Sequence, residues 1–322
     1  MKAETLKALL HELPQSPAFL YYPDRESPWL MARQMDACAR VGALKTGPLA
    51  RYLDRPLVKP VVAACGGALS RADLDAVAFA DRTIDRPHSR AAAAGIAAAF
   101  EAPWFDFEVS FAAWTSNFLG FASAQMSRPG ANLVLQLGFT QEDVEMLNYY
   151  VGADQRHLFE YDLHPVRATG RPTLAWVRID VQGKVALIEE IQSDWLRFTG
   201  EVSKTWARTR PNRHLTHAMR IYHGLMRERY EAIWPRAALL AALAALRMMM
   251  GVREVYMHQP RTGAALKGIA GRPPPRSLYS QLPKSFGFRP TSQVPPLLGR
   301  RHRRRLAPFR RAGEPAFWHL SL

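Results

Sequence analysis

Residues 185–197 read VALIEEIQSDWLR, and this stretch decides how the second half of the chain folds. Its first residues are apolar on both faces of a strand, with Ala186 and Ile188 on one face and Val185 and Leu187 on the other. A strand with two apolar faces is covered on both sides, so it lies inside a sheet. We therefore expect a central strand whose polar residues emerge at its carboxyl end.

That polar end is the first candidate site, because ligands of open α/β sheets bind at the carboxyl ends of the strands. Regular alternation puts Glu190 on the face of Ile188 and Glu189 on the face of Leu187. A carboxylate near apolar walls can have a raised pKa and act as a general base. The alternative is that either glutamate is paired with a nearby arginine. The candidate substrate-contacting residues that follow are Gln192, Ser193, Asp194 and Trp195.

The segments around this strand predict a mixed sheet. PTLAWVRIDV at 172–181 and the turn QGK predict an antiparallel hairpin with it, and HLFEYDLHPV at 157–166 alternates like a further strand. A charged helical region and an apolar helix beginning near Pro235 follow, and then the strands REVYMHQP at 253–260 and PAFWHLSL at 315–322. The expected fold class is α/β (α+β), a mixed sheet with helices on both faces.

The first hundred residues have a mainly helical pattern. Ser27 and Pro28 predict the start of a helix that runs to about Arg40, and Ser70 with Asp73 predicts a capped helix start. SRAAAAGIAAAF predicts another helix before the aromatic, β-branched segments WFDFEVSF and ANLVLQLGF, which read as strands. We place a boundary near residue 102, which gives a helical region 1–102 and a mixed α/β domain 103–322.

Charge is uneven along the chain. The net charge is +15, and residues 151–322 alone carry +17. Within them, GRRHRRRLAPFRR at 299–311 is either a solvated basic loop or a binding site for an anion or polyanion, including nucleic acid, although no RNP, KH or zinc-finger pattern accompanies it. The candidate anion-binding residues are Arg300, Arg301, Arg303, Arg304 and Arg305.

Several classes of protein have no support in the sequence. No apolar run approaches the roughly 18 residues of a membrane span, so no membrane partner is expected. The N-terminal stretch MKAETLKALLHEL is amphipathic and predicts a short helix rather than a secretory signal. Cys38 and Cys65 form no C-x-x-C pair, so we expect neither disulfides nor a thiolate zinc site, and we assign the protein to the cytoplasm. G-x-S-x-G, P-loop and dinucleotide-binding motifs are absent.

A second group of polar residues follows the strand at 253–260. His258 and Gln259 end that strand, and Thr262 opens the next helix, where free amides and the helix dipole suit a phosphate or carboxylate. A generic carboxylate and imidazole set, Glu160, Asp162 and His164, shares one face of the expected strand at 157–166 and could hold a metal ion. No metal is predicted in the preferred interpretation.

From about Thr173 to Leu322 the order of elements resembles the later half of a GNAT-type N-acyltransferase domain: a hairpin into a central strand, a long helix, a strand, a short helix and then LYSQLPKSFGF. That last segment is similar to the family's tyrosine followed by Gly-Phe, here Tyr279 with Gly287 and Phe288. The resemblance implies an acyl-CoA donor and a Tyr279 that protonates the departing thiolate. RYEAIWPRAALL at 229–240 stands where the family has its glycine-rich pyrophosphate loop.

Three hypotheses follow. The preferred one is an N-acyltransferase that acts on an amine with an acyl-CoA-type donor, using Glu189 or Glu190 as base, His258 beside them and Tyr279 as acid. The first alternative is a catalytically inactive GNAT-like module that binds nucleic acid or another polyanion through the arginine-rich segment. The second alternative is a metal-dependent hydrolase. The segment IEEIQSDW also resembles a stretch of uncharacterised phage-associated polyproteins, and this resemblance implies no activity.

Overall fold

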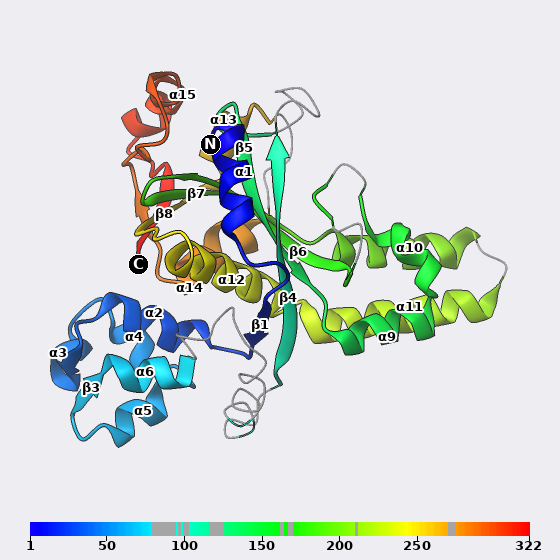
Figure 1. Cartoon of the computed structure of the whole chain (residues 1–322), viewed down its shortest axis with the longest axis horizontal. Coiled ribbons are helices and arrows are strands. Elements are labelled where there is room, and N and C mark those ends of the chain that lie inside the picture. Colours follow the sequence, from blue (N-terminus) through cyan, green and yellow to red (C-terminus); the bar gives the residue numbers. More distant parts are fainter. Residues whose placement is uncertain are drawn as a thin grey trace.

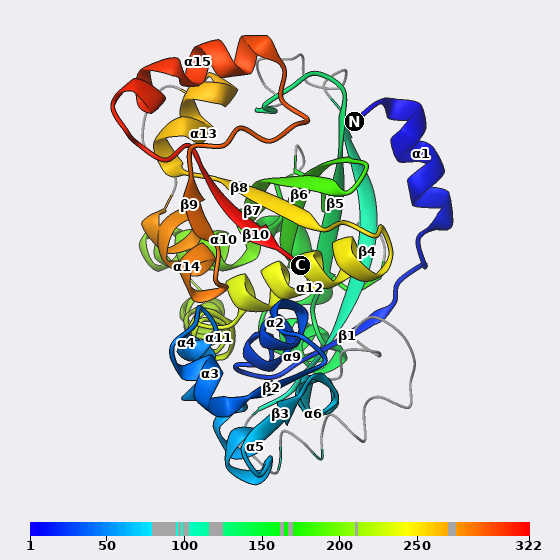
Figure 2. The same cartoon turned by 90° about the vertical axis from the view of Figure 1, so that its left-hand side faces the viewer.

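The structure is a computed structural model that describes residues 1–78, 95, 98, 103–115, 125–161, 164–166, 170–209, 212–269 and 275–322. Its main feature is an eight-stranded mixed sheet (Figures 1 and 2). In spatial order the strands are β1 (Ala18–Tyr21), β4 (Phe105–Thr115), β5 (Ala131–Gly138), β6 (Thr173–Gln182), β7 (Val185–Gln192), β8 (Glu254–His258), β10 (Phe317–Ser321) and β9 (Arg289–Thr291). The expected mixed α/β class is confirmed.

The quoted stretch forms β7, which lies inside the sheet with β6 on one side and β8 on the other. The β6–β7 pair is the predicted antiparallel hairpin. The β7–β8 pair is parallel, whereas the other neighbouring strands pair antiparallel. The central position of β7 follows from its two apolar faces, which helices cover on both sides.

One face of the sheet is covered by α12 (Trp234–Met248), which packs against β5, β6 and β7. Every residue from Ala237 to Leu246 is buried, as expected for a helix that is apolar on all sides. On the opposite face, Leu187 packs in a separate cluster with residues of α13 (Pro260–Lys267) and α15 (Arg300–Arg311). Figure 2 shows α13 and α15 together at one end of the molecule.

A helical arm extends from one end of the sheet (Figure 1). Its parts are α9 (Gln141–Tyr150), the 3₁₀ helix η2 (Ala153–Phe159), α10 (Asp194–Thr209) and α11 (Arg213–Tyr230). The helices α10 and α11 pack against each other, and Asn212 caps α11 by accepting hydrogen bonds from two backbone amides. The charged helical region predicted from the sequence is therefore two helices.

The strand predicted at 157–166 is wrong, because none of the described residues of this segment belongs to a strand. Its first residues belong to η2, where the ion pair between Arg156 and Glu160 (2.7 Å) spans one helical turn. Phe159 is the one fully buried side chain of η2, and it packs on Trp195. The alternation of polar and apolar residues was accidental, because burial of a single anchor does not require a strand.

The N-terminal region contains α1 (Ala3–Glu12), α2 (Glu26–Gln34), α3 (Val41–Lys45), α4 (Ala50–Leu53), α5 (Lys59–Ala64) and α6 (Arg71–Ala78). The predicted helix to Arg40 ends early, because β2 (Cys38–Arg40) pairs with β3 (Ala68–Ser70). The capping box at α6 is confirmed: Asp73 N donates to Ser70 Oγ and Ser70 N to Asp73 Oδ2, each at 3.1 Å.

The N-terminal region shares the main sheet, because β1 pairs with β4. It is also tied to α12, where Arg236 Nε donates to the fully buried Glu26 at 2.6 Å. The predicted boundary near residue 102 and most of the helix predicted for SRAAAAGIAAAF lie outside the described residues.

Candidate functional site

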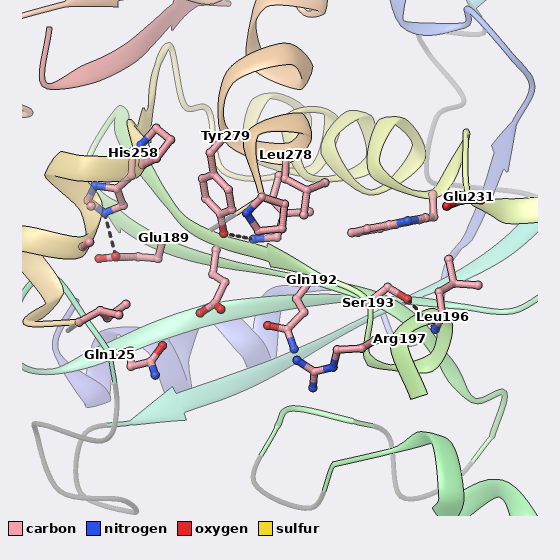
Figure 3. Close-up of a pocket in the computed structure, with 18 of the residues that line it drawn as sticks. Gln125, Glu189, Gln192, Ser193, Leu196, Arg197, Glu231, His258, Leu278 and Tyr279 are labelled. Atoms are coloured by element: carbon pink, nitrogen blue, oxygen red, sulfur yellow. Dashed lines mark hydrogen bonds and ion pairs between the residues drawn. The ribbon is translucent and has the colours of Figure 1, made fainter. Parts of the chain in front are cut away.

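A cavity of about 730 Å³ lies where β7 and β8 stop pairing. The parallel register runs from Val185–Glu254 to Ile188–Met257 and ends there, although β7 continues to Gln192. Both glutamates, His258, Gln259 and Tyr279 line the cavity, so the two polar strand ends predicted from the sequence meet at one place (Figure 3). Further walls come from α10, α11, the first residue of α12 and α13.

A β-bulge explains how both glutamates reach this cavity. Opposite β6, Ile188 pairs with Ile179 and Glu190 pairs with Arg178, so Glu189 is an extra residue in β7. Ile188 and Ile191 then lie in the same core cluster, although a regular strand would place them on opposite faces. The alternation predicted beyond Ile188 is wrong for this reason, and Glu190 does not share the face of Ile188.

Glu189 is fully buried and held by several donors. Ser127 donates to its carboxylate twice, from N to Oε1 at 3.2 Å and from Oγ to Oε2 at 2.9 Å. Lys267 Nζ lies 3.6 Å from Oε2 and donates to the Glu189 carbonyl oxygen at 2.5 Å. Burial alone would raise the pKa of Glu189, but the hydrogen bond with His258 and the charges of Lys267 and Arg178 lower it overall. Glu189 therefore stays ionised and is a weak base.

The His258 ring is buried against Glu189 and Ser127. Its Nε2 lies 3.0 Å from Glu189 Oε2 and 2.9 Å from Ser127 Oγ. Burial lowers the pKa of His258 although Glu189 opposes this, so the imidazole is neutral at neutral pH. Its buried Nδ1 has no hydrogen-bond partner among the described residues. Gly263 of α13 packs on this ring, since a Cβ there would lie 2.9 Å from His258 Cβ.

Ser127, His258 and Glu189 do not form a nucleophilic triad. In a triad the serine and the carboxylate contact different ring nitrogens, whereas here both contact Nε2. Ser127 is 2% exposed and does not reach the cavity wall. The three residues are a buried polar brace at the base of the cavity.

Glu190 contacts both an arginine and the cavity, so the two alternatives predicted for the glutamates are combined in this residue. Arg178 Nη2 donates to Glu190 Oε2 at 2.7 Å and to the Gln125 carbonyl at 2.8 Å. The Arg178 side chain is 1% exposed and Glu190 is 20% exposed. Arg178 orients one carboxylate oxygen, and Glu190 remains in contact with the space where a ligand would lie.

Tyr279 extends into the cavity from the short π-helical turn η3 (Ser277–Gln281). Its hydroxyl accepts a hydrogen bond from Ile191 N at 3.3 Å, and Trp318 Nε1 fixes its backbone by donating to the carbonyl at 2.8 Å. Burial and then the negative charge of Glu190 raise the pKa of Tyr279. The phenol is therefore protonated at neutral pH and is available as a proton donor.

The remaining sequence candidates divide into cavity residues and structural residues. Gln192, Ser193 and Gln259 line the cavity. Three others are buried and engaged elsewhere: Asp194, Trp195 and Thr262.

Each of the three has a structural role. Asp194 accepts hydrogen bonds from His164 Nδ1 at 2.7 Å and Trp176 Nε1 at 3.2 Å; burial would raise its pKa, but these bonds lower it. Trp195 donates to Tyr222 in the core at 3.0 Å. Thr262 donates to the Ala316 carbonyl at 2.5 Å.

Sequence reasoning missed Lys267, Ser127 and Arg178. Lys267 carried a usable signal, because Pro260, Gly263 and Lys267 lie one helical turn apart and all line the cavity. The regular register of the hairpin would have placed Arg178 opposite a glutamate. Ser127 lies before β5 and had no local signal, since only the tertiary fold brings it to Glu189.

The other predicted sites lie away from the cavity. Glu160 forms an ion pair with Arg156, and His164 forms a hydrogen bond with Asp194. Asp162 is outside the described residues. No three His, Cys, Asp or Glu side chains gather as a metal site in the part of the chain that the structure describes. The arginine-rich segment is the helix α15 rather than a loop, and the exposed candidates on it are Arg300, Arg301, Arg303, Arg304 and Arg305.

Comparison with known proteins identifies no relative, so the function of the site is inferred from its geometry alone. No protein-family model matches this chain, and no curated protein or solved structure is significantly similar to it. None of the described helices has the length and apolarity needed to cross a membrane.

Proposed function

We propose that the protein is an N-acyltransferase that transfers an acyl group from a CoA-type thioester to an amine. One observation carries this proposal: a carboxylate, Glu190, and a neutral phenol, Tyr279, line the same cavity where β7 and β8 separate. Acyl transfer to an amine needs a proton acceptor on one side of the reacting carbon and a proton donor on the other.

The arrangement of elements also supports it. A hairpin leads into β7, a long apolar helix returns the chain to β8 parallel to β7, and a short helix and closing strand follow. This is the order on which the GNAT-type resemblance rests. The Tyr279 segment packs beside the end of β7, since its hydroxyl meets the backbone of Ile191.

In the proposed reaction, the amine nitrogen attacks the thioester carbonyl carbon. A C–N bond forms, and the C–S bond breaks. Glu190 accepts the proton that the amine loses, and Tyr279 donates its proton to the departing thiolate. The products are an amide and a free thiol, and proton transfer through solvent restores both side chains. Glu189 takes no proton in this scheme, because its buried brace holds it ionised.

The backbone N–H of Ile191 has a role in the same step. Its hydrogen bond to the Tyr279 hydroxyl is long, at 3.3 Å, and therefore weak. A stronger acceptor can replace the hydroxyl as the partner of this N–H. A thioester carbonyl placed in the cavity can accept this N–H as negative charge develops on its oxygen.

The test is binding and then turnover. Calorimetric titration with acetyl-CoA is expected to give saturable heat, and a panel of amines is expected to release free thiol, detected with a thiol-reactive chromophore. Glu190→Gln and Tyr279→Phe should each lower kcat about 10²-fold or more, because each removes one proton-transfer group. Gln141→Glu, on the remote helix α9, is the control. No heat and no thermal shift at millimolar acetyl-CoA would refute the proposal.

A second candidate function, polyanion binding, is favoured by α15. Its arginines are exposed while Leu306 is buried against the protein, so the helix presents a basic face to solvent. Guanidinium groups on such a face suit the phosphates of a nucleic acid. Binding of a short DNA duplex should weaken steeply with salt and disappear when Arg300, Arg303 and Arg304 are changed to Gln. Binding that is independent of salt, or unchanged in that variant, would exclude this function.

A further inference from the structure

The wall of the cavity opposite the Glu189 brace is basic. The side chains concerned come from the facing helices α10 and α11: Arg197, Lys204, His223 and Arg227. Figure 3 shows Arg197 at one end of the cavity and Glu189 with His258 at the other, and Tyr279 and Leu278 lie between them. The cavity thus has a reactive end and a cationic end.

The acidic groups near the cationic end leave it with a positive balance. Arg227 binds Glu231 through Nε at 3.0 Å and Nη2 at 2.8 Å, and both side chains are exposed. Arg197 Nη2 donates to Asp194 at 3.0 Å, but a guanidinium has five N–H donors. Lys204 is exposed at the wall and contributes a further charge. A bound anion can therefore gain two or three charge-assisted hydrogen bonds here.

The His223 ring lies within the field of these cations. Its pKa is lowered by burial and then by the charges of Arg227 and Lys204, so both cations act at one point of the wall. Thr199 Oγ1 lies 3.3 Å from His223 Nδ1 and holds the ring in place. A neutral imidazole of this kind can donate one more hydrogen bond to an anion.

The sequence explains why side chains are needed at this end. The segment RYEAIWPRAALL lacks the kind of glycine-rich loop whose backbone amides bind a pyrophosphate. The apolar side chain of Leu278 lies between Tyr279 and Arg197 on the wall (Figure 3), and Trp234 also lines the cavity. A thioester donor that carries its phosphates on an apolar linker would place its reacting carbon beside Tyr279, its linker along the apolar wall and its phosphates at the cationic end.

We infer that the phosphates of the thioester donor are bound by the side-chain cations Arg197, Lys204 and Arg227 of the α10–α11 hairpin rather than by a backbone loop. This inference rests on the proposed acyltransferase function and names how its donor is recognised. It assigns the hairpin, an insertion between β7 and α12, to donor binding.

The experiment is a calorimetric comparison of two probes. CoA carries the phosphates, and pantetheine carries only the thiol and linker. The variant Lys204→Gln/Arg227→Gln removes two cations at exposed positions, so it is expected to fold normally. We expect CoA to bind this variant at least about tenfold more weakly than the wild type, and pantetheine to bind both equally. Added salt should weaken CoA binding less in the variant than in the wild type.

The control is Arg208→Gln/Arg220→Gln, which removes two exposed arginines from the same helices away from the cavity wall and should leave CoA binding unchanged. If CoA binds the wild type and the Lys204/Arg227 variant equally, the inference is wrong while the acyltransferase proposal stands. Equal binding of CoA and pantetheine to the wild type, or equal weakening of both in the variant, also overturns it. If the wild type binds neither probe, the proposed function itself fails.

Discussion

Glu189 and Glu190 are adjacent in the sequence, yet their surroundings give them different chemistry. Glu189 is fully buried between Ser127, His258 and Lys267, and although burial raises its pKa, His258, Lys267 and Arg178 lower it overall. Glu190 keeps one side toward the cavity while Arg178 orients it. We therefore propose that Glu189 stabilises the fold and that Glu190 takes part in proton transfer.

The first prediction concerns the stability that Glu189 contributes. Glu189→Gln should lower the free energy of unfolding by about 3–5 kcal/mol, because it leaves Lys267 buried without a counter-charge. Urea unfolding measures this. Glu190→Gln is the matched control and should cost less, because Glu190 is partly exposed and because Arg178 keeps its bond to the Gln125 carbonyl and the nearby charge of Glu189. Equal losses in the two variants would contradict the assignment.

The second prediction gives the pH dependence of that contribution. A carboxyl group whose pKa is lower in the folded than in the unfolded state stabilises the fold above its unfolded pKa, and this stability is lost as pH falls. The unfolded value is about 4.3. The difference between wild type and Glu189→Gln should therefore be constant from pH 6 to 8 and shrink below about pH 4. A difference that grows on acidification would contradict this.

At the scale of elements, the site depends on close packing of α13 against β8. Gly263 lets the helix approach, because a Cβ there would meet the Cβ of His258 at 2.9 Å. The same helix presents Lys267 to Glu189. The β7 bulge and this close approach together hold the polar brace.

The third prediction follows from that packing. Gly263→Ala should destabilise the protein by about 1–3 kcal/mol and weaken CoA binding, because the added methyl group pushes α13 and its Lys267 away from the strand. Thermal or urea unfolding and calorimetry measure the two effects. Gly224→Ala on α11 is the control: nothing lies within 4 Å of its Cβ, so it should stabilise by about 0.5–1 kcal/mol. A change in the free energy of unfolding with the same sign in both variants would contradict this explanation.

At the scale of the whole molecule, the N-terminal region and the main sheet are joined by strand pairing and by a buried ion pair. Glu26 at the start of α2 is fully buried, and Arg236 of α12 is its partner. Burial raises the pKa of Glu26, and the charge of Arg236 lowers it part of the way back.

The fourth prediction tests this connection. Arg236→Gln should destabilise the protein by about 3 kcal/mol at pH 7, because the buried Glu26 then loses the guanidinium that binds it. With its pKa raised further, Glu26 binds a proton more tightly in the folded state, so the variant should lose stability as pH rises above about 4. Hydrogen exchange of α2 and urea unfolding at several pH values measure the effect. A variant whose stability increases with pH over this range would exclude the mechanism.

How much the sequence predicts differs from element to element. The hairpin, the apolar helix α12 and the strand β8 were predictable, because each has a strong local pattern of apolar residues and turn residues. The conformation of residues 157–159 was not predictable, since a single buried phenylalanine, Phe159, anchors them as the end of a 3₁₀ helix. For the arginine-rich segment the sequence suggested a loop, but Leu306 and its neighbours dock it on the protein as α15.

The sequence by itself determined that β7 is central and that polar groups end both β7 and β8, because burial of two apolar faces leaves no other place for that strand. Only the tertiary structure decided which way the glutamates point. The bulge is a shift of one residue in pairing with β6, and its energy depends on contacts with Ser127, His258, Arg178 and Lys267. Except for Arg178 in the neighbouring strand, these partners lie far from β7 along the chain, so no local pattern predicts the bulge.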